Sequence, residues 1–74
     1  MRLHPKADEL LLKISEYFIL TGDTSFPATQ ITTDVTYDPY YADLIAEGYI
    51  MQKTDINETI VLLDRCIAFA NQLR

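Results

Sequence analysis

The spacing of apolar residues changes at Gly48, and this change limits the folds open to the chain. Before Gly48, Tyr41, Leu44 and Ile45 recur at three- and four-residue spacing, which places them on one face of a helix. After it, residues 49–52 alternate between two faces, as in a strand. The sequence therefore predicts a helix that ends at Gly48 and leads directly into a strand.

A second strand is predicted shortly after the first. Residues 59–62 are rich in β-branched side chains, which favour extended backbone. Residues 54–58 contain the Asp and Asn that are typical of turns, so the two strands are expected to form a hairpin. Asp64 is then suited to begin a last helix, in which Ile67 and Ala70 share one side.

The N-terminal part of the chain also has helical spacing. Apolar side chains recur every three or four residues from Leu10 to Phe18, and Pro5 suits a first helical turn. These features predict a helix over residues 6–20, which Gly22 ends because glycine readily adopts left-handed backbone.

A short second helix and a third helix are expected next. Ser25 can cap the second helix, with Pro27 in its first turn and with Ile31 and Val35 pointing inward, although several threonines in this stretch are weak helix formers. Asp38 is followed by a proline, a pair that suits the start of the third helix.

Size and composition bound the class of protein. Seventy-four residues make one domain, 1–74, near the lower limit at which a hydrophobic core alone stabilises a fold. No window has the roughly 18 uninterrupted apolar residues of a membrane span, and the first residues lack the apolar core of a secretory signal. A cytoplasmic location and no membrane contact are therefore expected.

Catalysis is the function that the composition supports least. His4 is the single histidine and Cys66 the single cysteine, so the chain cannot assemble a His-based acid–base pair or a metal site of His and Cys ligands. Asp55 and Asn57 supply too few ligands for a calcium loop, and the two glycines are isolated, so no phosphate-binding loop is present. We expect a non-enzyme without catalytic residues, cofactor or metal.

Two segments carry a resemblance to a known family. They are LIAEGYI at 44–50 and IVLLDRCIAFANQL at 60–73. They resemble the winged helix-turn-helix proteins, in particular the MarR-like, PadR-like and small YjcQ-like proteins of bacteria and phages. The resemblance implies an α+β winged helix-turn-helix fold with three N-terminal helices, a β-hairpin wing and a C-terminal helix. It also implies a transcription regulator that binds DNA through its third helix and its wing.

The distribution of charge opposes DNA binding through that helix. The net charge is −5, and residues 14–52 contain no Lys or Arg but six Asp and Glu. Nucleic-acid binding draws most of its affinity from Lys and Arg. The helical period turns Tyr40, Asp43 and Glu47 outward on the third helix. The candidate contact residues of the wing are Lys53, Asp55 and Asn57, of which only Lys53 is basic. DNA binding is therefore disfavoured, unless a dimer gathers the terminal bases.

Two kinds of partner remain open. The first is DNA, which the resemblance implies. The second is a basic protein, which an acidic interaction module or inhibitor would bind through Tyr40, Asp43 and Glu47, because tyrosine supplies large contact area at low entropic cost.

The last helix has apolar residues on more than one side, namely Ile67, Phe69, Ala70 and Leu73. A homodimer through this helix is one expectation. The alternative is that the helix folds against the first helix of its own chain.

Overall fold

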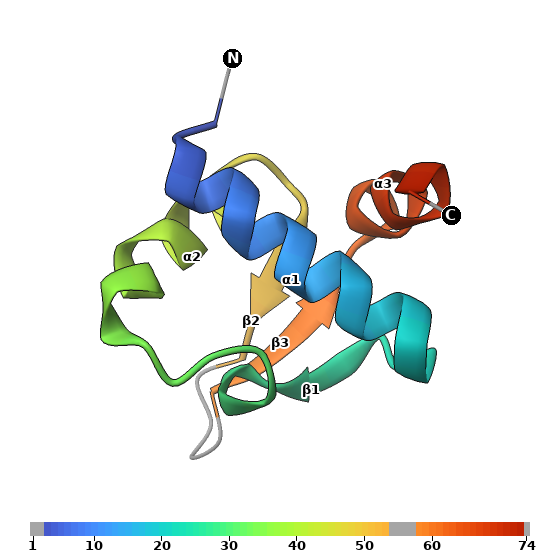
Figure 1. Ribbon diagram of the computed structural model, residues 1–74, viewed down its shortest axis with the longest axis horizontal. Helices are drawn as coiled ribbons and strands as arrows, with labels where there is room; N and C mark the ends of the chain where they lie inside the picture. Colours follow the sequence, from blue (N-terminus) through green and yellow to red (C-terminus); the bar gives the residue numbers. More distant parts are fainter. Residues whose placement is uncertain (1–2, 54–57, 74) are drawn as a thin grey trace.

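The computed structural model describes residues 3–53 and 58–73 of the chain (Figure 1). Within these ranges the chain forms three α-helices, three short strands and two single turns of 3-10 helix. In chain order they are α1 (Pro5–Thr21), β1 (Ser25–Pro27), η1 (Ala28–Gln30), η2 (Val35–Tyr37), α2 (Asp38–Ala46), β2 (Ile50–Gln52), β3 (Thr59–Leu62) and α3 (Asp64–Leu73).

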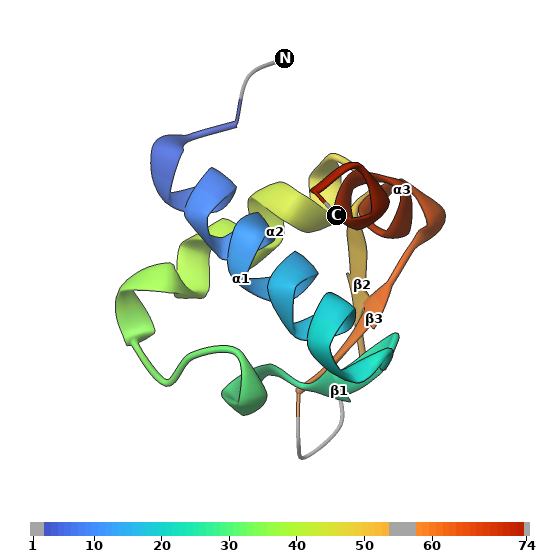
Figure 2. The same cartoon turned by 45° about the vertical axis from the view of Figure 1, so that its right-hand side comes forward.

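The described strands form an antiparallel sheet in the order β1-β3-β2. Phe26 of β1 lies opposite Ile60, and Met51 of β2 lies opposite Val61. The helix α1 runs across one face of the sheet, and both α2 and α3 pack against α1 (Figures 1 and 2).

Side chains from the helices and from the sheet share one hydrophobic core. Leu10 and Ile14 of α1, Leu44 of α2 and Ile60 of β3 are all fully buried, and Ile50 of β2 is 1% exposed. Because these residues come from four different elements, the core fixes the positions of α2 and the sheet relative to α1.

The predicted boundaries of the first and third helices are confirmed to within a residue or two. Gly22 follows α1 with φ +76°, and its backbone N–H donates to the Phe18 carbonyl over 2.7 Å. Gly48 follows α2 with φ +79°, and its N–H donates to the Ile45 carbonyl over 3.0 Å. Both glycines adopt the left-handed backbone that ends a helix at low steric cost.

The expected second helix is wrong. Ser25 does not cap a helix but begins strand β1, which pairs with β3. A proline disfavours helical backbone at the residue before it, so Phe26, which precedes Pro27, is extended. The threonine-rich stretch that follows forms only the turns η1 and η2, in which Val35, expected to point inward, is 73% exposed.

The winged helix-turn-helix fold with three N-terminal helices is wrong as a consequence. In the part of the chain that the structure describes, α1 and α2 are the only α-helices before the hairpin, and strand β1 stands where the second helix was expected to begin. The fold is α+β, with three helices and a three-stranded antiparallel sheet.

The hairpin and the last helix agree with the sequence prediction. Strands β2 and β3 pair as expected, and α3 begins at Asp64. Ile45, predicted to share a helix face with Tyr41 and Leu44, is 39% exposed, whereas those two residues are buried. Among the described residues, no helix is long and apolar enough to cross a membrane.

Candidate binding surface

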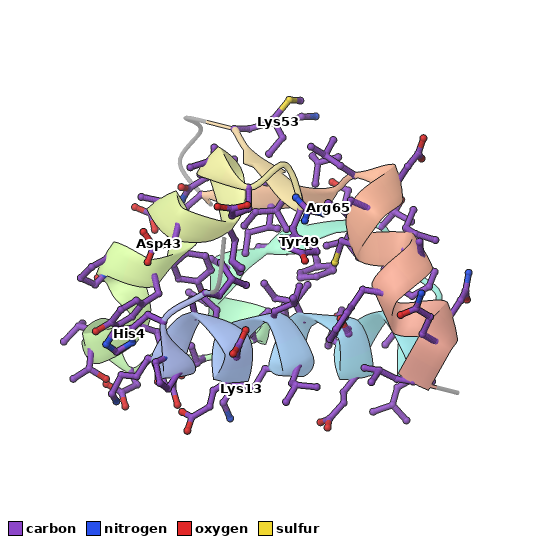
Figure 3. All side chains as sticks on the ribbon, turned by 90° about the horizontal axis from the view of Figure 1, so that it is seen from above. His4, Lys13, Asp43, Tyr49, Lys53 and Arg65 are labelled. Carbon is purple, nitrogen blue, oxygen red and sulfur yellow. The ribbon has the colours of Figure 1, made fainter. Side chains whose placement is uncertain are left out.

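The outward face predicted for residues Tyr40, Asp43 and Glu47 lies on α2, but its three side chains have different surroundings. Asp43 is exposed on the outer side of α2 (Figure 3). Tyr40 is half-buried, and its ring stacks on His4 with the centroids 4.8 Å apart. The Glu47 carboxylate lies 3.7 Å from the Arg65 guanidinium. Asp43 is therefore the member of this set that remains available to a partner.

Arg65 is held between α2 and α3 by several contacts. It donates a hydrogen bond to the backbone carbonyl of Glu47, at the end of α2 where carbonyls lack helical partners. Its guanidinium carbon also lies 4.4 Å from the ring centroid of Tyr49 (Figure 3). The Tyr49 ring in turn meets Phe69 edge-on. Arg65 thus serves as a link between two helices, and its charge is partly matched by Glu47.

Two further basic side chains lie against one tyrosine ring. The ammonium groups of Lys6 and Lys13 lie 5.1 Å and 6.0 Å from the ring centroid of Tyr37, at distances where a cation attracts a ring face. The Tyr37 hydroxyl donates to Glu9 over 3.0 Å, and this hydrogen bond raises the pKa of Tyr37. The positive charge of α1 therefore gathers around Tyr37, away from the exposed Asp43.

The wing residues are only partly described. Lys53 is exposed at the end of β2 (Figure 3), whereas Asp55 and Asn57 lie outside the described residues. Met51, within β2, is 49% exposed, and Lys53 directly follows that strand.

The four residues expected at a dimer interface have different environments. Ala70 is fully buried within its own chain, and Ile67 and Phe69 pack half-buried against the core. Leu73 is 44% exposed near the end of α3. Because α3 packs against α1, this arrangement matches the alternative in which the last helix folds onto the first.

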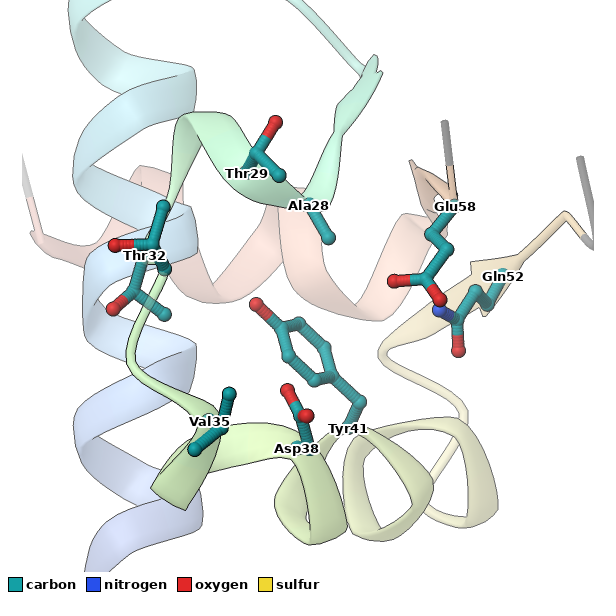
Figure 4. Close-up of a pocket in the computed structure, with 9 residues that line it drawn as sticks. Ala28, Thr29, Thr32, Val35, Asp38, Tyr41, Gln52 and Glu58 are labelled. Carbon is teal, nitrogen blue, oxygen red and sulfur yellow. The ribbon is translucent and has the colours of Figure 1, made fainter. Parts of the chain in front are cut away.

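A pocket of about 380 Å³ opens between the hairpin and the segment that leads into α2 (Figure 4). Its walls come from η1 and the following loop, from η2 and α2, and from β2 and the residue just before β3. The lining residues are Ala28, Thr29, Thr32, Thr33, Val35, Asp38, Tyr41, Gln52 and Glu58. This site was not predicted from the sequence, because helical spacing placed Tyr41 on one face with Leu44, and Asp38 and Glu58 were assigned to a helix start and a turn.

Tyr41 carries the main polar feature of the pocket. The residue is 7% exposed, and its hydroxyl has no hydrogen-bond partner among the described residues. Burial raises the pKa of Tyr41, and the negative charges of Asp38 and Glu58 raise it further. The hydroxyl is therefore neutral at physiological pH and is free to accept or donate a hydrogen bond.

The candidate nucleophiles Ser15 and Cys66 are enclosed in the core. Both are fully buried, and burial raises the pKa of the Cys66 thiol, with the neighbouring Ser15 acting in the opposite direction. A thiol that stays protonated is a poor nucleophile. Within residues 3–53 and 58–73, no group of three or more His, Cys, Asp or Glu is placed to hold a metal ion.

The Asp34 carboxyl is expected to titrate below its ordinary pKa of 3.8. It accepts hydrogen bonds from the backbone N–H of Thr36 over 2.9 Å and from the Thr36 hydroxyl over 2.8 Å, and Lys6 and Lys13 add a smaller effect. Because the pKa is lowered on folding, the stabilising contribution is complete above the unfolded pKa and is lost as the pH falls through the folded one.

Carbon-detected NMR titration of the Asp34 side chain measures this pKa directly. In Thr36→Val, one of the two hydrogen bonds is removed, so the pKa should move part of the way back toward 3.8. An Asp34 pKa at or above 3.8 in the unsubstituted protein would contradict the structure of this turn.

Comparison with known proteins adds no relative. No protein-family model matches the sequence, and neither a curated protein nor a solved structure matches it. The fold and surface define a small α+β domain with exposed carboxylates on α2 and an acidic pocket beside it.

Proposed function

We propose that this chain is a non-enzymatic interaction module that binds a basic segment of a protein partner. The observation that carries the proposal is that carboxylates in and just before α2 are exposed to solvent. Asp38 and Asp43 are exposed and make no ion pair with a described Lys or Arg, and Asp34 just before them is also exposed. Such a surface attracts cations and repels phosphates.

The basic side chains support the same proposal by their positions. Lys6 and Lys13 lie on the α1 side of the molecule against Tyr37, and Arg65 lies between α2 and α3. Arg65 pairs with Glu47, one helical turn after Asp43, whereas Lys6 and Lys13 lie against Tyr37 just before α2. Asp43 has no ion pair with a described Lys or Arg, so a partner that approaches this residue meets unmatched negative charge.

Exposed apolar residues in and just before α2 would add contact area. Val35 is 73% exposed just before α2, and Ile45 is 39% exposed within it. Protein interfaces combine apolar contact with polar groups at their rim. Ser15 and Cys66 are fully buried, so neither side chain is accessible as a nucleophile.

Fluorescence anisotropy of a labelled nine-residue peptide of alternating Arg and Ala tests the proposal. We expect saturable binding that weakens with salt, because the contacts are between exposed charges. The double variant Asp38→Asn/Asp43→Asn should raise the Kd about fivefold or more, at about 0.5 to 1 kcal/mol for each exposed charge removed.

The matched control is Asp8→Asn/Asp23→Asn. It removes the same charge from exposed positions, and Asp8 occupies the first turn of α1 as Asp38 occupies that of α2. Equal weakening by both double variants would show attraction to net charge alone and would overturn the proposed surface.

A labelled DNA duplex, titrated from very low to physiological salt, tests the regulator that the resemblance implies. Duplex binding that exceeds peptide binding and that Asp38→Asn/Asp43→Asn strengthens would replace the proposal with DNA recognition. Absence of duplex binding together with α2-dependent peptide binding would support it.

A further inference from the structure

We propose that the pocket beside α2 receives the guanidinium group of an arginine from the basic partner. This inference rests on the proposed function, because it names the group through which the partner would be anchored. Three features of the pocket favour this ligand: the unpartnered Tyr41 hydroxyl, the charge of the lining and the spread of its acceptors.

The first observation is the buried Tyr41 hydroxyl. Figure 4 shows its oxygen directed into the space between η1 and the segment that contains Thr32, with Asp38 below the ring. The side chain is 7% exposed, and the hydroxyl lacks a partner in the described part of the chain. A buried polar group without a hydrogen bond is unfavourable, so a ligand that supplies the bond gains affinity.

The second observation is the charge of the lining. Asp38 at the start of α2 and Glu58 just before β3 both face the pocket, and no Lys, Arg or His is among the described residues that line it. The Gln52 side chain and the hydroxyls of Thr29 and Thr32 add acceptors around the same space. An anion would be repelled here, and a neutral group would leave both carboxylates unmatched.

The third observation selects guanidinium over ammonium. The acceptors are distributed around the pocket on at least three segments, and a guanidinium group has five N–H donors spread in one plane. Lysine offers a single compact ammonium group, which cannot reach acceptors on opposite walls at once. Ala28 and the exposed Val35 provide apolar surface against which the methylene stem of an arginine can pack.

The size and position of the pocket fit a side chain that belongs to a larger partner. About 380 Å³ lies at the lower end of the range for ligand sites, which suits one side chain. Asp38 belongs both to the pocket and to the exposed carboxylates of α2, so a peptide lying along α2 can place one arginine in the pocket.

The test uses three small probes that differ only in their side-chain head group: N-acetyl-arginine, N-acetyl-lysine and N-acetyl-citrulline N-methylamides. Citrulline has nearly the shape of arginine without its charge. Two-dimensional ¹H–¹⁵N NMR spectra should show saturable shifts at Thr32, Tyr41 and Gln52 with the arginine probe, and binding of the citrulline probe should be at least about tenfold weaker.

Two variants test the residues themselves. Tyr41→Phe removes the hydroxyl that would accept a guanidinium N–H, and Glu58→Gln removes one carboxylate, so each should weaken the arginine probe by about threefold to tenfold. The matched control is Tyr40→Phe, which deletes the same atom from the neighbouring ring that stacks on His4. It should leave probe binding unchanged.

Measurements of Tm distinguish weaker probe binding from loss of the folded state in these variants. The Tyr41 hydroxyl makes no hydrogen bond, so Tyr41→Phe should retain or raise the Tm. Glu58 has φ +50°, a left-handed backbone that glycine adopts with less strain, so Glu58→Gly removes the carboxylate while preserving or raising the Tm. Weaker probe binding in these stable variants would support the pocket.

The outcomes separate this inference from the proposed function. No saturable shift at the pocket amides, equal binding of the citrulline probe, or equal effects of Tyr41→Phe and Tyr40→Phe would each overturn the pocket. If the Arg peptide still depends on Asp43 in that case, the interaction surface stands without the pocket. If instead the arginine probe binds and the peptide does not, the pocket stands and the partner-binding surface fails.

Discussion

Leu10→Ala should lower the free energy of unfolding by about 3 kcal/mol. The Leu10 side chain is fully buried in α1, within the core that α2 and the sheet share. Its truncation removes apolar contacts and leaves a cavity that a closely packed core fills only in part. A domain of this length has a total stability of about 4 to 11 kcal/mol, so the variant should keep only about 1 to 8 kcal/mol and unfold at a lower urea concentration.

Urea denaturation followed by circular dichroism at 222 nm suits this measurement, because the chain has no tryptophan to report by fluorescence. Leu20→Ala is the matched control, since Leu20 belongs to the same helix and is 83% exposed. Its effect should stay within about 0.5 kcal/mol. Equal destabilisation by the two changes would mean that α1 does not bury the face assigned to it.

Ala70→Asp should destabilise the fold by about 3 kcal/mol or more. Ala70 is fully buried, and its helix α3 packs against α1. An aspartate at this position would place an unpaired carboxylate in the buried core, away from solvent. The chain must then either unfold or release α3 from α1 to expose the charge.

Ala68→Asp provides the control for the second prediction. Ala68 is exposed two residues earlier in α3, so the same substitution there changes helix propensity and net charge but buries nothing. We expect a cost of about 0.6 kcal/mol, which is the difference in helix propensity alone. Thermal unfolding monitored by circular dichroism compares the two variants.

The same pair of variants bears on self-association. If α3 were the centre of a homodimer with α1 released, Ala70→Asp would lower the mass measured by light scattering while the monomer kept its Tm. If Ala70→Asp instead lowers the Tm while the measured mass stays that of a monomer, the result supports the packing of α3 on its own chain.

The helices and the hairpin could be predicted from the sequence because their signals are local. Helical spacing from Leu10 onward, the glycines at the ends of α1 and α2, and the β-branched residues of β3 each act over a few neighbouring residues. These signals located α1, α2, β2, β3 and α3 to within a few residues of their observed bounds.

The prediction for the segment after α1 was wrong because the structure of this segment depends on pairing with a distant strand. The apparent cap at Ser25 favoured a helix, but Phe26 pairs with Ile60, far along the chain, and this pairing determines the backbone. One local signal was present: the position of Phe26 before Pro27 disfavours helix.

The outward orientation of the candidate side chains on α2 was predicted, but their contacts with other elements were not. Helical period turned Tyr40 and Glu47 away from the core, but it carries no information about His4 or Arg65, which engage these two side chains from other elements. The pocket was missed for a similar reason, since Tyr41 and Glu58 meet there only after the hairpin packs beside α2.

The strand order β1-β3-β2 leaves β1 and β2 at the two borders of the described sheet. Border strands can pair with strands of other molecules and so promote aggregation. Each of these strands is only three residues long, β1 ends in a proline, and β2 is followed by the exposed Lys53. Short length, proline and lysine all oppose edge-to-edge pairing, so Lys53 contributes to keeping copies of this chain apart.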